Sequence, residues 1–327
     1  MNRKAVVTGG GGFMGAYLVK KLLKDGWDVG VIDTMIRGSI SRLSSVERDI
    51  ELHSIDVRDE EKVSKAIKGA DVVFHLAAIN GTENFYNHPE LVLDVGIRGA
   101  IAVVNACRNA EVPDLVVASS AEVYQTPKVV PTSENVALML PNSTNPRYSY
   151  GCSKITSELI ALNYAREHFA KLQIFRPHNV YGPDMGWKHV IPQFITRAQE
   201  LLAKNKTALF PIQGDGSETR AFCFVDDIVN GILTMYQNGE HRRIYHIGND
   251  EEVSIAGLVD HLGNVMGGRL EIVKSPPSEG GTVRRCPDIS KMKSIGYNPK
   301  VNLKDGLKST ATWYLENRNQ DPSNTLL

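Results

Sequence analysis

The feature that most limits the possible folds is a glycine cluster that directly follows an apolar run. The segment KAVVTG (4–9) is apolar enough for a buried strand, and GGGFMG follows it just where an amphipathic stretch begins. Gly9, Gly12 and Gly15 have the spacing G-x-x-G-x-x-G. Glycines at a strand-to-helix turn permit a tight turn and let backbone N–H groups approach a diphosphate at the helix N-terminus. The pattern therefore predicts a dinucleotide-binding α/β protein.

Short apolar runs alternate with amphipathic stretches through the first half of the chain. The expected strands are 4–9, 27–33, 50–56, 71–77, 114–120 and 172–177. The expected helices lie near 13–25, 59–68, 90–110 and 149–169. Apolar strands that alternate with helices are typical of a parallel sheet covered on both faces. We predict a Rossmann-type, doubly wound α/β domain over residues 1–177.

The amino-acid composition and the lengths of the expected elements change from about residue 178 onward. Proline and glycine become more frequent, and the expected strands ALFPI, AFCFV and RIYHIG are short. Helical patterns lie near 190–203, 226–238, 254–265 and 303–316. We predict a smaller mixed α/β domain that binds substrate over residues 178–327, with some later segments able to return to the first sheet.

Bulk properties exclude several classes of function. Lys+Arg and Asp+Glu both number 37, so the net charge gives no reason to expect a nucleic-acid or membrane-surface partner. Four scattered cysteines and nine histidines lack metal-ligand spacing, and we expect no metal. The chain has neither a secretory signal pattern nor an apolar run of the roughly 18 residues that a membrane span needs. A cytoplasmic protein is the expectation.

Acidic residues at the ends of two strands extend the cofactor hypothesis. Asp33 ends the second expected strand, where a carboxylate would accept both hydroxyls of an adenosine ribose and repel a 2′-phosphate. This favours NAD over NADP, although Arg37 is close by. Asp56 and Val57 end another strand, and we expect them beside the adenine ring.

A tyrosine and a lysine stand together in RYSYGCSK (147–154). Tyr150 and Lys154 are four residues apart at an expected helix start, so both side chains would share one helix face. The spacing alone fits two interpretations. One is an ordinary surface pair, and the other is a tyrosine base whose pKa is lowered by a neighbouring cation.

Five segments in order along the chain carry a resemblance to a known family. They are TGGGGFMG, HLAA (75–78), SSAEVY (119–124), YGCSK (150–154) and RPHNVYGP (176–183). Together they resemble the extended short-chain dehydrogenase/reductase family, in particular its nucleotide-sugar epimerases and dehydratases of the UDP-galactose 4-epimerase-like group. The resemblance implies an NAD-dependent enzyme that transiently oxidises C4 of a nucleotide-diphosphate sugar, with 4-epimerisation favoured.

The resemblance also assigns roles to individual residues. It implies a catalytic set of Ser120, Tyr150 and Lys154. It implies cofactor contacts at the glycines and at Phe13, Met14, Leu76, Ala77 and Ala78. It implies substrate contacts at Thr82, Asn179, Gln213, Arg220, Arg285 and Asp288. The two arginines would clamp the substrate diphosphate, a task suited to guanidinium groups.

The resemblance leaves the fate of the keto intermediate open. Glu122 stands where dehydratases and decarboxylases of the family carry a glutamate that handles a proton, but a carboxylate there could equally orient substrate. A 4,6-dehydratase, a decarboxylase and a net C4 dehydrogenase are therefore alternatives, and a non-catalytic NAD sensor is a remote one. Gly96 replaces the asparagine that relatives usually carry near the catalytic lysine. The family's two long helices, here 90–110 and 149–169, imply a homodimer.

Overall fold

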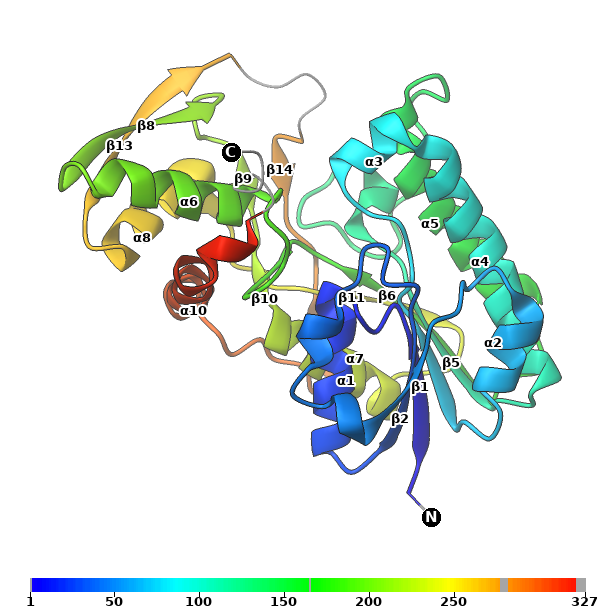
Figure 1. Cartoon of the computed structure of the whole chain (residues 1–327). Coiled ribbons are helices and arrows are strands. Elements are labelled where there is room, and N and C mark those ends of the chain that lie inside the picture. The colour runs from blue at the N-terminus through cyan, green and yellow to red at the C-terminus, as the bar shows by residue number, and fades with distance from the viewer. Residues whose placement is uncertain (1, 165, 277–281, 322–327) are drawn as a thin grey trace.

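The computed structural model describes residues 2–164, 166–276 and 282–321. Its centre is a parallel sheet of seven strands in the order β11-β6-β5-β4-β1-β2-β3 (Figure 1). The strands are β1 (Lys4–Thr8), β2 (Asp28–Ile32), β3 (Ile50–His53), β4 (Val72–His75), β5 (Asp114–Ala118), β6 (Lys171–Pro177) and β11 (Arg243–Ile247). This confirms the predicted doubly wound α/β sheet.

Helices cover both faces of this sheet. One face packs against α1 (Phe13–Lys24), α7 (Val225–Asn238) and the short α9 (Ser290–Ser294). The other packs against α2 (Glu60–Ala66), α4 (Pro89–Asn109) and α5 (Ser149–Tyr164). Residue 165, inside the helix expected over 149–169, lies outside the described residues. Neighbouring residues of each central strand face opposite cores, as Val6 does relative to Val7, which explains the continuous apolar runs.

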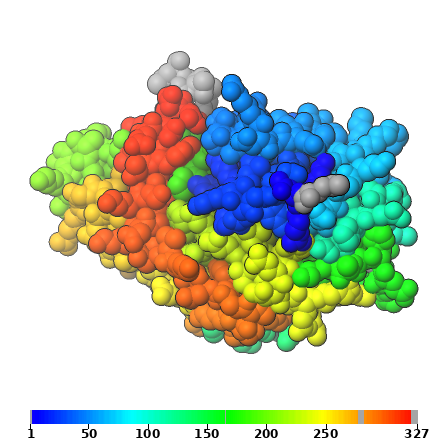
Figure 2. All heavy atoms as spheres, turned by 90° about the horizontal axis from the view of Figure 1, so that it is seen from below, coloured from blue at the N-terminus to red at the C-terminus, as the bar shows by residue number. Residues whose placement is uncertain are grey.

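The chain returns to the sheet after leaving it. Helix α7 packs beside α1, and β11 pairs in parallel with β6 at the sheet edge. Figure 2 shows the N-terminal segment in blue lying directly against the yellow-green segment that contains α7. The domain boundary between residues 177 and 178 stays a prediction. Of the later elements, β11 is a strand of the first sheet, and α7 packs on one of its faces.

A smaller lobe has its own apolar core. It contains α6 (Val190–Leu202), α8 (Ile255–Val265) and α10 (Leu303–Glu316) around the parallel pair β8 (Thr207–Gln213) and β13 (Arg269–Ser275). Figure 1 shows this lobe to one side of the sheet, near the ends at which β1 and its neighbours finish. The sequence did not predict β13, whose side chains are mostly exposed.

Short elements connect the two parts. The strands β7 (Val180–Tyr181) and β10 (Cys223–Phe224) form one parallel pair. A three-stranded sheet joins β9 (Thr219–Arg220), β12 (Val253–Ser254) and β14 (Arg284–Arg285). The short helices are α3 (Thr82–Asn87), η1 (Ile40–Leu43), η2 (Glu47–Asp49), η3 (Ala121–Tyr124), η4 (Pro146–Tyr148) and η5 (Arg318–Gln320). None of the helices in the described part of the chain is long and apolar enough to cross a membrane.

Candidate active site

The glycine cluster forms a turn in which the backbone is too closely packed for side chains. Gly9 has a φ of 73°, and a Cβ there would lie 2.8 Å from the backbone of Ala77. A Cβ at Gly15 would overlap the carbonyl oxygen of Gly9. Gly12 caps α1 without a side-chain hydrogen bond, so the first N–H groups of the helix stay open to a ligand. The geometry fits the diphosphate of a dinucleotide.

A pocket runs along the ends of four strands beside this turn. The loops after β1, β2, β3 and β4 form its walls, and its lining includes the predicted residues Gly9, Gly12, Asp33, Asp56, Val57, Leu76, Ala77 and Ala78. Asp33 is fixed by two backbone N–H groups, because Oδ2 accepts from Gly11 at 2.9 Å and Oδ1 from Met35 at 2.8 Å. The pocket has the carboxylate, glycine turn and apolar floor that NAD binding requires.

Three of the predicted cofactor residues have side chains engaged elsewhere. Asp56 pairs with Arg58, whose hydrogen bonds lower the pKa of this carboxyl group. Phe13 packs edge-on against Tyr17 at 5.8 Å, and Met14 packs into the core that α1 shares with the sheet. Contacts of Phe13 and Met14 with a cofactor would therefore come from their backbone at the start of α1.

Ser120 and Tyr150 lie close together where α5 packs against η3, at the end of the strand next to β4. Ser120 follows β5 and begins η3, where its Oγ accepts a hydrogen bond from the N–H of Glu122 at 3.1 Å. Tyr150 lies in the first turn of α5, only 8% exposed, with its ring stacked on Phe85 at 5.1 Å. The Ser120 hydroxyl lies close enough to Tyr150 to lower the pKa of the phenol. The structure thus brings together the two residues expected to contact the reacting hydroxyl.

The surroundings of Tyr150 correct one expectation. Its pKa was expected to be lowered, but burial and, to a smaller extent, the charge of Glu122 raise it to about 12, while Ser120 and the charge of Arg37 act in the opposite direction. The contribution expected from Lys154 stays a prediction. Its ammonium lies 5.8 Å from the centre of the Tyr150 ring and donates to the Ala118 carbonyl at 2.8 Å.

Lys154 is itself buried beneath the site. Burial lowers its pKa to about 8, and the nearby carboxylate of Glu158 opposes that shift. The ammonium therefore remains mostly protonated at neutral pH, and it is held at the end of β5 by a strand carbonyl. In this position the ammonium can stabilise the turn after β5, which carries Ser120, and the adjacent pocket.

Two arginines stand side by side in the small three-stranded sheet. Arg220 of β9 and Arg285 of β14 are register partners in a parallel pair. Burial lowers the pKa of Arg220, and the nearby charge of Arg285 lowers it further. Arg285 Nη1 also donates to Glu122 Oε1 at 2.6 Å, an ion pair that links β14 to η3. Two adjacent guanidinium groups suit a diphosphate.

The other predicted substrate residues are less closely grouped. Asn179 borders β7 and its amide donates to the Ala221 carbonyl at 3.1 Å, next to Arg220. Thr82 is exposed at the start of α3, and Gln213 is exposed at the end of β8. The Asp288 carboxylate accepts from the Ser290 N–H at 2.9 Å. Within the described ranges, no group of three or more His, Cys, Asp or Glu side chains could hold a metal.

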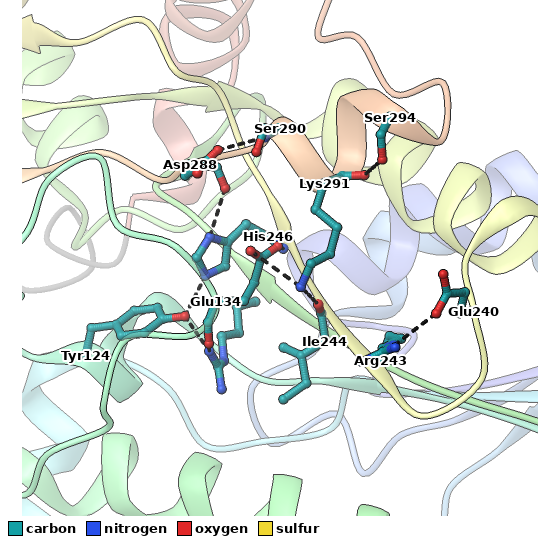
Figure 3. A network of polar contacts seen from close by, with 11 residues as sticks. Tyr124, Glu134, Glu240, Arg243, Ile244, His246, Asp288, Ser290, Lys291 and Ser294 are labelled. Atoms are coloured by element: carbon teal, nitrogen blue, oxygen red, sulfur yellow. Dashed lines mark hydrogen bonds and ion pairs between the residues drawn. The ribbon is translucent and has the colours of Figure 1, made fainter.

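A buried polar network under the site escaped the sequence analysis (Figure 3). His246 of β11 donates from Nδ1 to the Asp288 carbonyl at 3.1 Å, so its Nε2 accepts from the Tyr124 hydroxyl at 2.6 Å. Burial lowers the pKa of His246, which keeps the ring neutral. Arg176 donates to the same Tyr124 hydroxyl and pairs with Glu158 at 2.6 Å. The network fixes η3 relative to the loop that follows Arg285.

Comparisons with known proteins agree with this geometry. A dinucleotide pocket beside a Ser, Tyr and Lys set on a parallel sheet defines an enzyme of short-chain dehydrogenase/reductase type. The sequence pattern of the NAD dependent epimerase/dehydratase family matches residues 5–248. The chain belongs to this family, and its cofactor is NAD.

Individual relatives cover nearly the whole chain. It is 32% identical to a putative UDP-glucose 4-epimerase of Methanocaldococcus jannaschii over 95% of this chain and 98% of the relative. It is 28% identical to a UDP-N-acetyl-alpha-D-glucosaminuronate decarboxylase of Bacillus cytotoxicus, covering 98% and 100%. The dTDP-glucose 4,6-dehydratase DesIV of Streptomyces venezuelae, solved with NAD bound, superposes with a TM-score of 0.84 at 28% identity, covering 98% and 99%.

Proposed function

We propose that this enzyme is a nucleotide-sugar 4-epimerase. The observation that carries the proposal is the close approach of Ser120 and Tyr150 next to the strand ends that form the cofactor pocket, with the ammonium of Lys154 5.8 Å from the centre of the phenol ring. Such a pair can remove a proton from a secondary alcohol as the alcohol becomes a ketone. The relative with 32% identity, a putative UDP-glucose 4-epimerase, supports the same reaction.

The residues divide the chemistry among them. Tyr150 takes the proton of the C4 hydroxyl through its oxygen and returns it when the ketone is reduced, and Ser120 orients that hydroxyl. Lys154 keeps a positive charge near the phenol ring. NAD, held by the glycine turn and Asp33, would supply the hydride acceptor and donor for C4. The protein therefore supplies position and electrostatics.

The paired arginines indicate how the substrate would bind. Arg220 and Arg285 would bind the nucleotide diphosphate, and Asn179 beside them would contact a phosphate oxygen. Thr82, Gln213 and Asp288 stay predictions for contacts with the sugar and the nucleotide. A diphosphate that binds Arg285 competes with Glu122 for the same guanidinium, so substrate binding would release this carboxylate.

A second reaction, dehydration or decarboxylation, has one observation in its favour. Glu122 lies close enough to Tyr150 to raise the pKa of the phenol, so its carboxylate can reach the neighbourhood of the reacting carbons. Relatives named as a decarboxylase and a 4,6-dehydratase have 28% identity. In this alternative, Glu122 would move a proton next to the new ketone.

Product analysis in heavy water distinguishes these reactions. The enzyme is incubated in D₂O with UDP-, GDP-, dTDP- and CDP-sugars, and the products are analysed by mass spectrometry and NMR. A 4-epimerase gives a product of unchanged mass, inverted at C4 and without carbon-bound deuterium. A product that has lost water or carbon dioxide and carries deuterium would replace the epimerase proposal with the second reaction.

We also propose that two chains associate through α4 and α5. On α5, Leu159 is 58% exposed and Tyr164 is 49% exposed, although their helix packs extensively against α4. Exposed apolar side chains on paired long helices suit a four-helix interface. Light scattering after size exclusion should give a dimer, and Leu159→Glu should give a monomer. Leu315→Glu on α10 is the matched control, and a monomeric wild type would contradict the proposal.

A further inference from the structure

The loop after β2 carries a cation that has no partner in the protein. Arg37 lies between β2 and η1 and lines the cofactor pocket. Within residues 2–164, 166–276 and 282–321, it makes neither a hydrogen bond nor an ion pair. The residue as a whole is exposed because the pocket is open, yet protein atoms surround its guanidinium closely enough to lower its pKa. An arginine in such a position normally has an anion to bind.

The guanidinium of Arg37 crosses the pocket rather than staying beside its own strand. Its Nη1 lies 3.0 Å and its Nη2 3.5 Å from the point that a Cβ on Gly81 would occupy. Gly81 belongs to the loop after β4, which forms the opposite wall. Arg37 therefore spans the pocket mouth from the loop after β2 to the loop after β4.

Nearby charges do not satisfy this cation. Glu83 has the carboxylate whose charge raises the pKa of Arg37, but this carboxylate forms an ion pair with Lys188. Arg42, the other cation close to it, adds positive charge and is itself paired with Asp184 at 3.0 Å.

The course of a dinucleotide through the pocket explains the missing partner. Its adenosine end is expected at Asp33 and Val57, and its nicotinamide end at the Leu76–Ala78 floor beside Tyr150. The diphosphate would pass between these ends, beside Gly9, Gly12 and Arg37, which line the same pocket. A guanidinium can donate two parallel N–H bonds to phosphate oxygens. The neutral backbone of the glycine turn would contact the diphosphate from the other side.

We propose that Arg37 binds the diphosphate of NAD and closes the pocket mouth over it. This differs from the role that an arginine after the second strand has in NADP enzymes, where it binds the 2′-phosphate of the adenosine ribose. It also gives the enzyme a means of retaining its cofactor while the sugar ketone turns over. The nearby Tyr150, whose pKa the charge of Arg37 lowers, would feel less of that charge once the diphosphate is bound.

Binding measurements on the full-length protein, freed of cofactor, test this assignment. Dissociation constants for NAD, ADP-ribose and NADP are measured by calorimetry for the wild type and for Arg37→Gln. Losing a charge-assisted hydrogen bond should weaken binding roughly tenfold or more. The loss should be equal for all three ligands because they share the diphosphate. The dissociation constants of Arg37→Lys should lie between those of the wild type and Arg37→Gln, because an ammonium keeps the positive charge but lacks the two parallel N–H donors of the guanidinium.

A matched control and a clear contrary result complete the test. Arg48→Gln removes the same charge from the exposed η2 outside the pocket and should leave all three dissociation constants unchanged. A loss of less than about fivefold for NAD overturns the proposal. A loss confined to NADP also overturns it, since Arg37 would then bind the 2′-phosphate. If the dissociation constants for the three ligands are unchanged and a nucleotide sugar with a carboxylate group binds more weakly, Arg37 binds the substrate instead.

Discussion

Arg285 Nη1 lies 2.6 Å from Glu122 Oε1, so a residue expected to clamp the substrate diphosphate is paired with the carboxylate beside the catalytic serine. The pair joins η3 to β14, and the buried network around His246 joins η3 to the loop that follows β14. An ion pair with both side chains partly buried is sensitive to a competing anion. A substrate diphosphate bound to Arg285, as proposed above, would therefore change the charge near Tyr150.

The charge of Glu122 should be visible in the pH profile. Since Glu122 raises the pKa of Tyr150, Glu122→Gln should lower it, and the rise of kcat/KM with pH should move to lower pH. Epimerisation itself should stay within about tenfold of the wild-type rate, because the proposed proton transfer belongs to Tyr150. The profile is measured by coupled assay from pH 6 to 10.

The control for this variant is Glu83→Gln. Glu83 lies on α3, is mostly exposed and does not act on the pKa of Tyr150, so its profile should match the wild type. A profile of Glu122→Gln that stays fixed or moves to higher pH would contradict the electrostatic role. A loss of about 10³-fold or more would instead assign Glu122 to proton transfer.

Tyr150→Phe should abolish turnover and leave the cofactor in place. The phenol oxygen is the proposed proton acceptor, and general-base contributions of this kind are about 10²–10⁴-fold. The ring would still stack on Phe85 and fill the same buried position, so the fold should be retained. Product formation and the NAD content of the purified protein are the two measurements. Tyr164→Phe, at the exposed end of α5, is the control, and wild-type turnover by Tyr150→Phe would remove Tyr150 from the mechanism.

The sequence predicted those parts of the molecule whose signal is local. The glycine spacing, the apolar strands and the pair Tyr150 and Lys154 each lie within one short segment, and local periodicity is what such patterns report. The cofactor residues Leu76 to Ala78 came instead from the family resemblance that the segment HLAA (75–78) helps to carry, and they line the pocket.

The parts that were missed depend on contacts between distant segments. Tyr124 and His246 are separated by 122 positions, and nothing near either residue indicates the other. The strand β13 was missed because it pairs only with β8 and exposes most of its side chains, which removes the apolar run expected of a core strand. Arg37 was noted only as an argument for NADP, since its direction across the pocket follows from the fold.

Gly96 has a structural reason that the sequence did not indicate. A Cβ at this position of α4 would lie 2.7 Å from Cβ and 2.8 Å from Oγ of Ser153 on α5. Ser157 also donates to the Gly96 carbonyl at 2.9 Å. Gly96, which stands where relatives usually carry an asparagine, therefore allows α4 and α5 to approach closely near Lys154.

Gly96→Ala should consequently destabilise the enzyme. Alanine in a helix gains about 1 kcal/mol over glycine, but overpacking at a tight contact costs about 1–3 kcal/mol. We expect a net loss of up to about 2 kcal/mol in the free energy of unfolding, measured by urea titration. Adding Ser153→Gly removes both close atoms, so the double variant should lose less than the sum of the single losses. A Gly96→Ala variant as stable as the wild type would show that the helices can separate without cost.

The last prediction concerns His75 under the glycine turn. His75 is 5% exposed, its Nδ1 lies 2.7 Å from Thr8 Oγ1, and the same hydroxyl accepts from the Ala77 N–H at 3.3 Å. The Thr8 hydroxyl therefore links the His75 ring to the backbone of the loop after β4. Burial, with a contribution from Lys154, lowers the pKa of His75 from 6.5 to about 3.

Because this pKa lies below the value in the unfolded chain, the unfolded state binds the proton first as the pH falls from 6.5 toward 3. Stability is therefore lost over that window, by about 2 kcal/mol between pH 7 and pH 5 for this single group. His75→Gln lacks the titration, so the unfolding free energy of the wild type relative to this variant should fall by that amount. His88→Gln, a change at an exposed histidine, should show no such trend relative to the wild type. A constant difference between wild type and His75→Gln from pH 7 to pH 5 would mean that the His75 ring accepts a proton without disturbing the turn that holds the cofactor.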